Sequence, residues 1–180
     1  RGGHVPLVKM LLSNSANVEH QAYGGIRPLH FAVNSLQEPT ALLLLEDGQA
    51  DANGADDQGN TSLHWAASRG RERMVKFLLE NKADATIVTE DSWSPVHDAA
   101  RVGSCACLRM LQQAGANMIL PTGNGSTPLH YAAQYDRTDA VVYLLNDAGP
   151  DSTLRDVANN MGQVCTCCML RCELFMLCRY

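Results

Sequence analysis

One seven-residue pattern occurs four times at a nearly constant spacing, and it constrains the fold more than any other feature of the chain. The copies begin at Arg27, Thr61, Ser94 and Thr127, so the steps between them are 34, 33 and 33 residues. They read RPLHFAV, TSLHWAA, SPVHDAA and TPLHYAA. A fixed period of about 33 residues is typical of an array of small stacked units, in which each unit buries its apolar face against its neighbours.

A second column of residues has the same period. It consists of five leucines, which are separated by 33, 34, 33 and 33 residues: Leu11, Leu44, Leu78, Leu111 and Leu144. All but Leu111 are followed by a second leucine. Two independent columns with one period indicate a repeat array that begins before the first copy of the motif.

Each unit is expected to contain two helices. A hydroxyl residue before the first helix, such as Thr61, can cap its free amides, and a proline such as Pro128 fits its first turn. The alanine pairs at the end of the motif allow neighbouring helices to approach closely. Gly70 and Gly103 fit a turn that requires positive φ, and the second helix then carries larger apolar residues such as Leu78.

Two units depart from this plan. Leu36 and Asp136 replace the turn glycine, and Pro39 is expected to open the second helix of its unit. We expect local irregularity at these positions rather than a different fold.

The T-P-L-H-x-A core at this period closely resembles the ankyrin repeat family. The resemblance implies an all-α solenoid of stacked helix-turn-helix units joined by β-hairpin-like loops. The predicted boundaries are a partial N-terminal repeat over 1–20, repeats over 21–53, 54–87, 88–120 and 121–153, and a degenerate Cys-rich tail over 154–180.

Both ends of the chain depart from the repeat. The N-terminus has no initiator Met and no signal-peptide pattern, and we interpret the chain as part of a longer one. Residues 164–180 have no repeat pattern, and we hypothesise that they are not a native continuation.

Composition excludes several classes of function. The net charge of −5 argues against a nucleic-acid surface, which needs a basic stripe. There is no apolar run of the roughly 20 residues that a membrane span needs. Five of the seven cysteines follow residue 164, so no disulfide framework holds the array, and a reducing cytoplasmic or nuclear location is expected.

The residues that could carry chemistry do not form a catalytic pattern. His30, His64, His97 and His130 occur once per unit, so we expect them to bridge backbone groups rather than to converge on a metal. The Cys165 and Cys168 pair lacks the second pair that a zinc site needs. We predict no catalytic residues, no metal and no cofactor.

The resemblance implies that a partner protein binds the concave surface made by loop tips and first helices. Tyr, Trp and Arg side chains most often supply binding energy at such surfaces. The predicted binding residues are Tyr23, Trp65, Arg69, Trp93, Arg101, Tyr131 and Tyr135. The alternative for Phe31, Trp65 and Tyr131, which follow the motif histidine, is that they pack adjacent helices together.

Asn53 lies in a segment that resembles the site modified by asparaginyl hydroxylases in ankyrin loops. Ala52 departs from the Val or Ile usual there. An ordinary turn residue is the alternative interpretation of Asn53.

The predicted function is therefore that of a monomeric protein-binding module, a scaffold or adaptor segment rather than an enzyme. Two narrower alternatives remain. The SPVHDAA motif followed by Cys105 and Cys107 resembles ankyrin and suppressor-of-cytokine-signalling-box adaptors of ubiquitin ligases, and PVHDAAR resembles the small ankyrin inhibitors of cyclin-dependent kinases.

Overall fold

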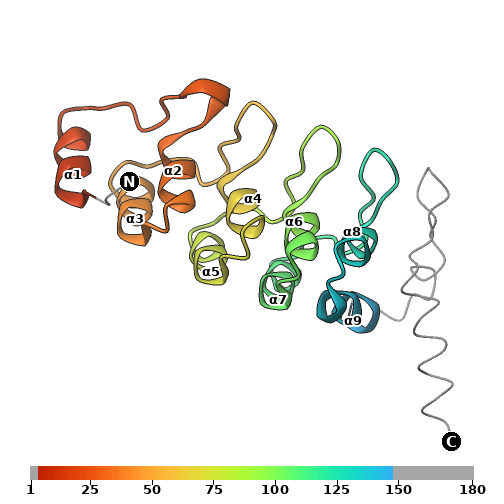
Figure 1. Cartoon of the computed structure of the whole chain (residues 1–180). Coiled ribbons are helices and arrows are strands. Elements are labelled where there is room, and N and C mark those ends of the chain that lie inside the picture. Colours follow the sequence, from red (N-terminus) through yellow and green to blue (C-terminus); the bar gives the residue numbers. More distant parts are fainter. Residues whose placement is uncertain (1–3, 148–180) are drawn as a thin grey trace, which may run out of the picture.

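The computed structural model describes residues 4–147, and within them the helices form a single row of pairs (Figure 1). The first helices of the four units are α2 (Pro28–Asn34), α4 (Ser62–Ala67), α6 (Pro95–Val102) and α8 (Pro128–Gln134). The second helices are α3 (Glu38–Glu46), α5 (Glu72–Glu80), α7 (Cys105–Gln113) and α9 (Thr138–Asp147). A further helix, α1 (Val5–Ser13), lies beside α3 at the N-terminal end, and a 3-10 turn, η1 (Tyr23–Gly25), precedes α2. The all-α repeat fold expected from the sequence is confirmed.

The core runs along the row because each helix contacts its partner and the equivalent helix of the next unit. The motif alanines Ala66, Ala67, Ala99 and Ala100 are completely buried, as expected for close helix contacts. Met74, Val75 and Leu78 of α5 are also completely buried, whereas Phe77 and Leu79 pack at the edge of the core.

The turn between the helices of a unit adopts positive φ whether or not it contains glycine. Gly70 and Gly103 have φ of 60° and 87°, as the sequence predicts. Leu36 and Asp136 occupy the same place with φ of 56° and 54°. Helix α3 begins at Glu38, one residue before the expected Pro39. The irregular units thus keep the turn geometry and accept backbone strain there.

The first helices are capped by the motif histidine, not by the hydroxyl alone. The backbone N–H of Thr61 donates to Nδ1 of His64 over 3.2 Å, and Ser94 and Thr127 make the same bond to His97 and His130. Arg27 does so to His30, although it has no hydroxyl. The imidazole three residues further along therefore makes the contact that the sequence analysis assigned to the hydroxyl.

A hairpin-like loop, here called a finger, precedes each first helix and extends to one side of the row (Figure 1). Fingers 1 to 4 comprise residues 20–26, 54–60, 87–93 and 120–126. Each is closed by a backbone hydrogen bond across its base, for example from Asp56 N–H to the Asn60 carbonyl. Further backbone bonds join finger 2 to finger 1, from Asp57 to Gly24, and finger 4 to finger 3, from Gly123 to Asp91.

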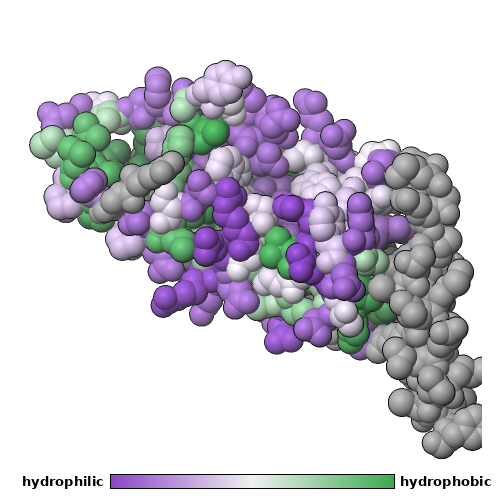
Figure 2. Space-filling view, in the orientation of Figure 1, coloured by the Kyte–Doolittle hydropathy of each residue, from purple (hydrophilic) through white to green (hydrophobic). Residues whose placement is uncertain are grey.

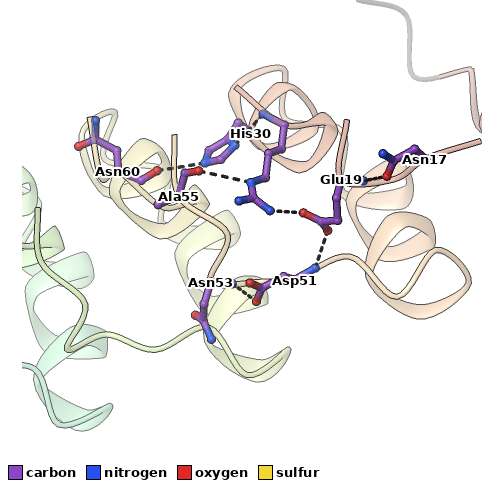
Figure 3. Close-up of polar contacts among 8 residues, drawn as sticks. Asn17, Glu19, His30, Asp51, Asn53, Ala55 and Asn60 are labelled. Atoms are coloured by element: carbon purple, nitrogen blue, oxygen red, sulfur yellow. Dashed lines mark hydrogen bonds and ion pairs between the residues drawn. The ribbon is translucent and has the colours of Figure 1, made fainter. Parts of the chain in front are cut away.

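Polar side chains also tie neighbouring units together near the N-terminal end (Figure 3). Glu19 forms an ion pair with Arg27 and accepts a hydrogen bond from the backbone N–H of Asp51. Arg27 in turn donates to the carbonyl of Ala55. The replacement of the motif threonine by Arg27 thus creates a link across three successive segments.

Several sequence predictions fall outside residues 4–147. These are the end of the fourth repeat, the Cys-rich tail over 154–180 and its Cys165 and Cys168 pair. The repeat boundaries as drawn from the sequence also stay predictions.

Candidate functional site

A groove of about 440 Å³ opens on the finger side of the molecule, between the first finger and helices α4 and α6. Finger 1 supplies one wall and finger 2 another, while the first helices form the floor. The lining residues are Tyr23, Gly24, Ile26, Asp56, Gln58, Asn60, His64, Trp65, Ser68, Arg69 and Asp98. Of the seven predicted binding residues, Tyr23, Trp65 and Arg69 are therefore brought together.

Trp65 is held in a fixed orientation at the floor of the groove. Its indole N–H donates to Oδ2 of Asp56 over 3.0 Å. The Arg69 guanidinium lies over the indole, 5.3 Å from the ring centroid, and the His30 ring packs against it at 5.6 Å. A cation over an aromatic ring is attracted by the negative face of that ring. The arrangement preorganises Trp65 and presents Arg69, which is exposed, to the open side.

Tyr23 is the most accessible aromatic residue of this site. Its side chain is 99% exposed at the tip of finger 1. Such an aromatic side chain gains buried area on contact with a partner while few rotatable bonds are frozen.

Asp98 places a buried carboxyl group beneath the groove. It is only 5% exposed, and Nη2 of Arg101 lies 3.3 Å from its Oδ1. Burial raises the pKa of Asp98 to about 6, although hydrogen bonds from Trp93 and Arg101 act in the opposite direction. The carboxylate is thus charged near neutral pH at a cost in stability.

The sequence analysis missed Asp98 as a site residue. Asp98 stands in the column that follows the motif histidine, where the other units carry Phe31, Trp65 and Tyr131. A search for aromatic and arginine side chains passes over it, but the departure from that column was a usable signal.

Trp93 and Tyr131 lie at the next junction along the row, where they pack with His97. The Trp93 ring stacks on His97 with centroids 5.3 Å apart, and Tyr131 meets Trp93 edge-on at 4.7 Å. Both residues are half-buried. These contacts join the third and fourth units, so the helix-packing interpretation accounts for both side chains. Their binding role stays a prediction.

The remaining predicted residues are separate from the groove. Tyr135 follows α8 and is 45% exposed, and Arg101 is engaged with Asp98. Asn53 bridges to the next unit, because its Oδ1 accepts a hydrogen bond from the backbone N–H of Asp84 over 2.7 Å (Figure 3 shows its position). This contact fits the ordinary turn interpretation, and hydroxylation of Asn53 stays a prediction.

The motif histidines have structural roles in the described residues, as expected. Nε2 of His30 lies 3.1 Å from the carbonyl of Asn60, and Nε2 of His64 lies 3.3 Å from that of Trp93. Because Nδ1 accepts the capping bond, the neutral Nε2–H form fits both contacts. Burial lowers the pKa of His64 and of His97 to about 4, and it also lowers the pKa of His30.

Residues 4–147 contain no grouping of three or more His, Cys, Asp or Glu side chains that could hold a metal ion. None of the helices in this range is long and apolar enough to cross a membrane. Cys105 and Cys107 are free thiols, and burial raises the pKa of each.

Comparison with known families gives one match that covers most of the chain. The family model described as ankyrin repeats (3 copies) matches residues 1–89 and 81–156.

Similar proteins share part of this chain. A Caenorhabditis briggsae protein named ankyrin repeat and KH domain-containing protein CBG24701 is 40% identical over 81 residues, which is 44% of this chain and 3% of that protein. The ankyrin repeat protein nuc-2 of Neurospora crassa is 37% identical over 89 residues, 49% of this chain and 8% of that protein. Palmitoyltransferase AKR1 of Gibberella zeae is 46% identical over 46 residues, 26% of this chain and 6% of that protein. The chain thus spans less than a tenth of the length of these relatives.

Proposed function

Because this chain belongs to the ankyrin repeat family, we propose that it binds a protein partner through the groove at Tyr23, Trp65 and Arg69. Ankyrin repeats are in general protein-interaction modules that do not catalyse reactions. The observation that carries the proposal is the open groove between two fingers and two first helices, with an exposed tyrosine and an exposed arginine at its mouth.

The mechanism of binding follows from rigidity. Trp65 and Arg69 are already held against each other, and the finger backbones are hydrogen-bonded across their bases and, for fingers 1 and 2, to each other. A preorganised surface loses little conformational entropy when a partner docks, so more of the contact energy appears as affinity.

In the cell we propose a scaffold or adaptor role within a larger protein, in the reducing cytoplasm or nucleus, with the module itself monomeric and not catalytic. The small share of the relatives that the chain covers supports the idea of a segment of a larger protein. The acidic balance of −5 supports a protein rather than a nucleic-acid partner.

The test compares two groove variants with a control on the opposite side. Tyr23→Ala and Arg69→Ala remove exposed groups, so the fold should be unchanged, and Arg73→Ala removes an exposed arginine from α5, away from the fingers. Proteins captured from a lysate of the source organism are identified by mass spectrometry, and the affinity of the strongest is then measured with purified components.

We expect each groove variant to weaken that affinity at least about tenfold, since central interface residues cost more than about 1.4 kcal/mol when truncated. Arg73→Ala should leave it unchanged. A partner that binds all three variants as tightly as the unaltered chain would place the binding surface elsewhere.

A further inference from the structure

A second cavity lies at the N-terminal end of the row and has a different character. It encloses about 690 Å³ between α1, α2 and α3, and its walls are largely apolar. Leu7, Leu11 and Phe31 line it and are 48%, 47% and 50% exposed. Figure 2 shows apolar side chains gathered at this end of the molecule.

The repeat itself shows that this exposure is unusual. Leu11 stands in the leucine column, where Leu44, Leu78, Leu111 and Leu144 are 5%, 0%, 0% and 2% exposed. The step of 33 residues from Leu11 to Leu44 also carries Pro6 onto Pro39 near the start of α3, so α1 corresponds to a second helix. In the described residues every other second helix packs against the first helix of its own unit, and α1 contacts α3 without such a partner.

The sequence ahead of α1 adds an independent sign. Gly3 precedes Gly70 by 67 residues and Gly70 precedes Gly103 by 33, so Gly3 holds the repeat position of the turn glycines. At Gly70 and Gly103 that turn, with positive φ, connects a first helix to a second helix. Glycine at this position is what a connection from a preceding first helix requires.

We propose that the groove between α1, α2 and α3 is the seat of a further first helix, which belongs to the same polypeptide and directly precedes α1. The helix presents a leucine and small alanines to the groove, because those are the residues that α4 and α6 bury against their second helices. It covers Leu7 and Leu11 from one side and packs on Phe31 of α2 from the other. The finger ahead of it extends the finger side of the molecule beyond Tyr23.

The experiment grafts this chain's own first helix onto its N-terminal end. Residues 57–70, which contain finger sequence and α4, are placed directly ahead of His4, so that Gly70 takes the position of Gly3. Amide hydrogen exchange of α1 is compared in the parent and in the grafted chain. The matched control is the same graft with Leu63→Glu and Ala66→Glu in the added copy, which charges its contact face.

We expect the graft to slow exchange in α1 at least about tenfold and to raise the melting temperature, because it removes local opening of an unpaired helix. The charged graft should do neither. If the intact graft is helical by circular dichroism and leaves exchange in α1 unchanged, the proposal is wrong.

A mutational cycle keeps the proposal testable where exchange data are ambiguous. Leu11→Ala should lower the melting temperature little in the parent chain and by several degrees in the grafted chain, whereas Leu78→Ala should lower it strongly in both. An equal effect of Leu11→Ala in both chains would overturn the proposal. So would sedimentation that shows the parent chain to be a dimer disrupted by Leu11→Glu, because a second copy would then be the occupant.

Discussion

Leu36 is the residue at which the chain's sequence and its backbone are most clearly in conflict. It adopts a φ of 56° at the turn where Gly70 and Gly103 stand in other units, and its side chain is 47% exposed. The left-handed region costs a residue with a Cβ atom about 1–2 kcal/mol. The side chain gains little from burial in return, so the turn in this unit lowers the stability of the fold.

We therefore predict that Leu36→Gly stabilises the protein by about 1 kcal/mol, since glycine accepts positive φ but is also freer in the unfolded chain. The reverse change, Gly103→Ala, should destabilise it, because φ is 87° and the new Cβ would lie 2.8 Å from Cδ of Arg137. Urea unfolding of both variants checks the pair. A loss of stability in Leu36→Gly would show that its side chain makes contacts of value.

Asp98 gives the second residue-scale prediction. Because its folded-state pKa is raised to about 6 and the unfolded value is near 4, the ionised carboxylate costs stability at pH 7 and costs nothing below pH 4. Asp98→Asn should thus raise the free energy of unfolding at pH 7 by roughly 1–2 kcal/mol, with the gain lost as pH falls from 6 to 4. Unfolding at pH 7 and pH 4 measures it. A variant less stable than the parent at pH 7 would show that the pair with Arg101 outweighs the cost of burial.

At the scale of single elements, the period of the two residue columns was sufficient to predict the helix pairs and the buried alanines. The fate of Trp93 could not be predicted, because it depends on contact with Tyr131, a residue of the next unit. The capping group was also assigned wrongly in part: the sequence shows a hydroxyl before each helix, but the reach of an imidazole three residues on is a matter of geometry. Side-chain partners across a junction depend on the offset between units, which the period alone does not contain.

Helix α5 is the best place to test the packing of one element. Leu78 is completely buried between its own unit and its neighbours, and Leu78→Ala should cost about 2–5 kcal/mol. The exposed Lys76→Ala on the same helix loses only a surface ion pair with Glu80, and should cost less than about 0.5 kcal/mol. Thermal unfolding of the two variants compares them. Similar losses would contradict the buried position of Leu78.

At the scale of the whole molecule, the buried histidines make stability depend on pH. His64 and His97 have folded-state pKa values of about 4, below the value of about 6.5 expected when unfolded, so the unfolded state binds more protons between these limits. Their stabilising effect is complete above pH 6.5 and is lost as pH falls to 4. Asp98, whose folded pKa is raised, gains stability over pH 6 to 4 and offsets part of this loss.

We predict a net loss of about 1.4 kcal/mol per pH unit between pH 6 and pH 4, since two histidines lose and one carboxyl group gains a similar amount per unit. His30, whose pKa is also lowered, adds to the loss. The measurement is the free energy of unfolding at half-unit steps of pH. In Asp98→Asn the dependence should become steeper, and a flat profile in the parent chain would mean that the histidines titrate normally.

The extensive helix contacts of this molecule occur only within a unit or between adjacent units. No brace connects distant parts of the row, so a pull on its ends is passed from junction to junction and each junction yields slightly. The molecule is then mechanically a spring, and the spacing of its fingers changes when tension is applied. A partner that grips two fingers would sense such tension as a change in fit.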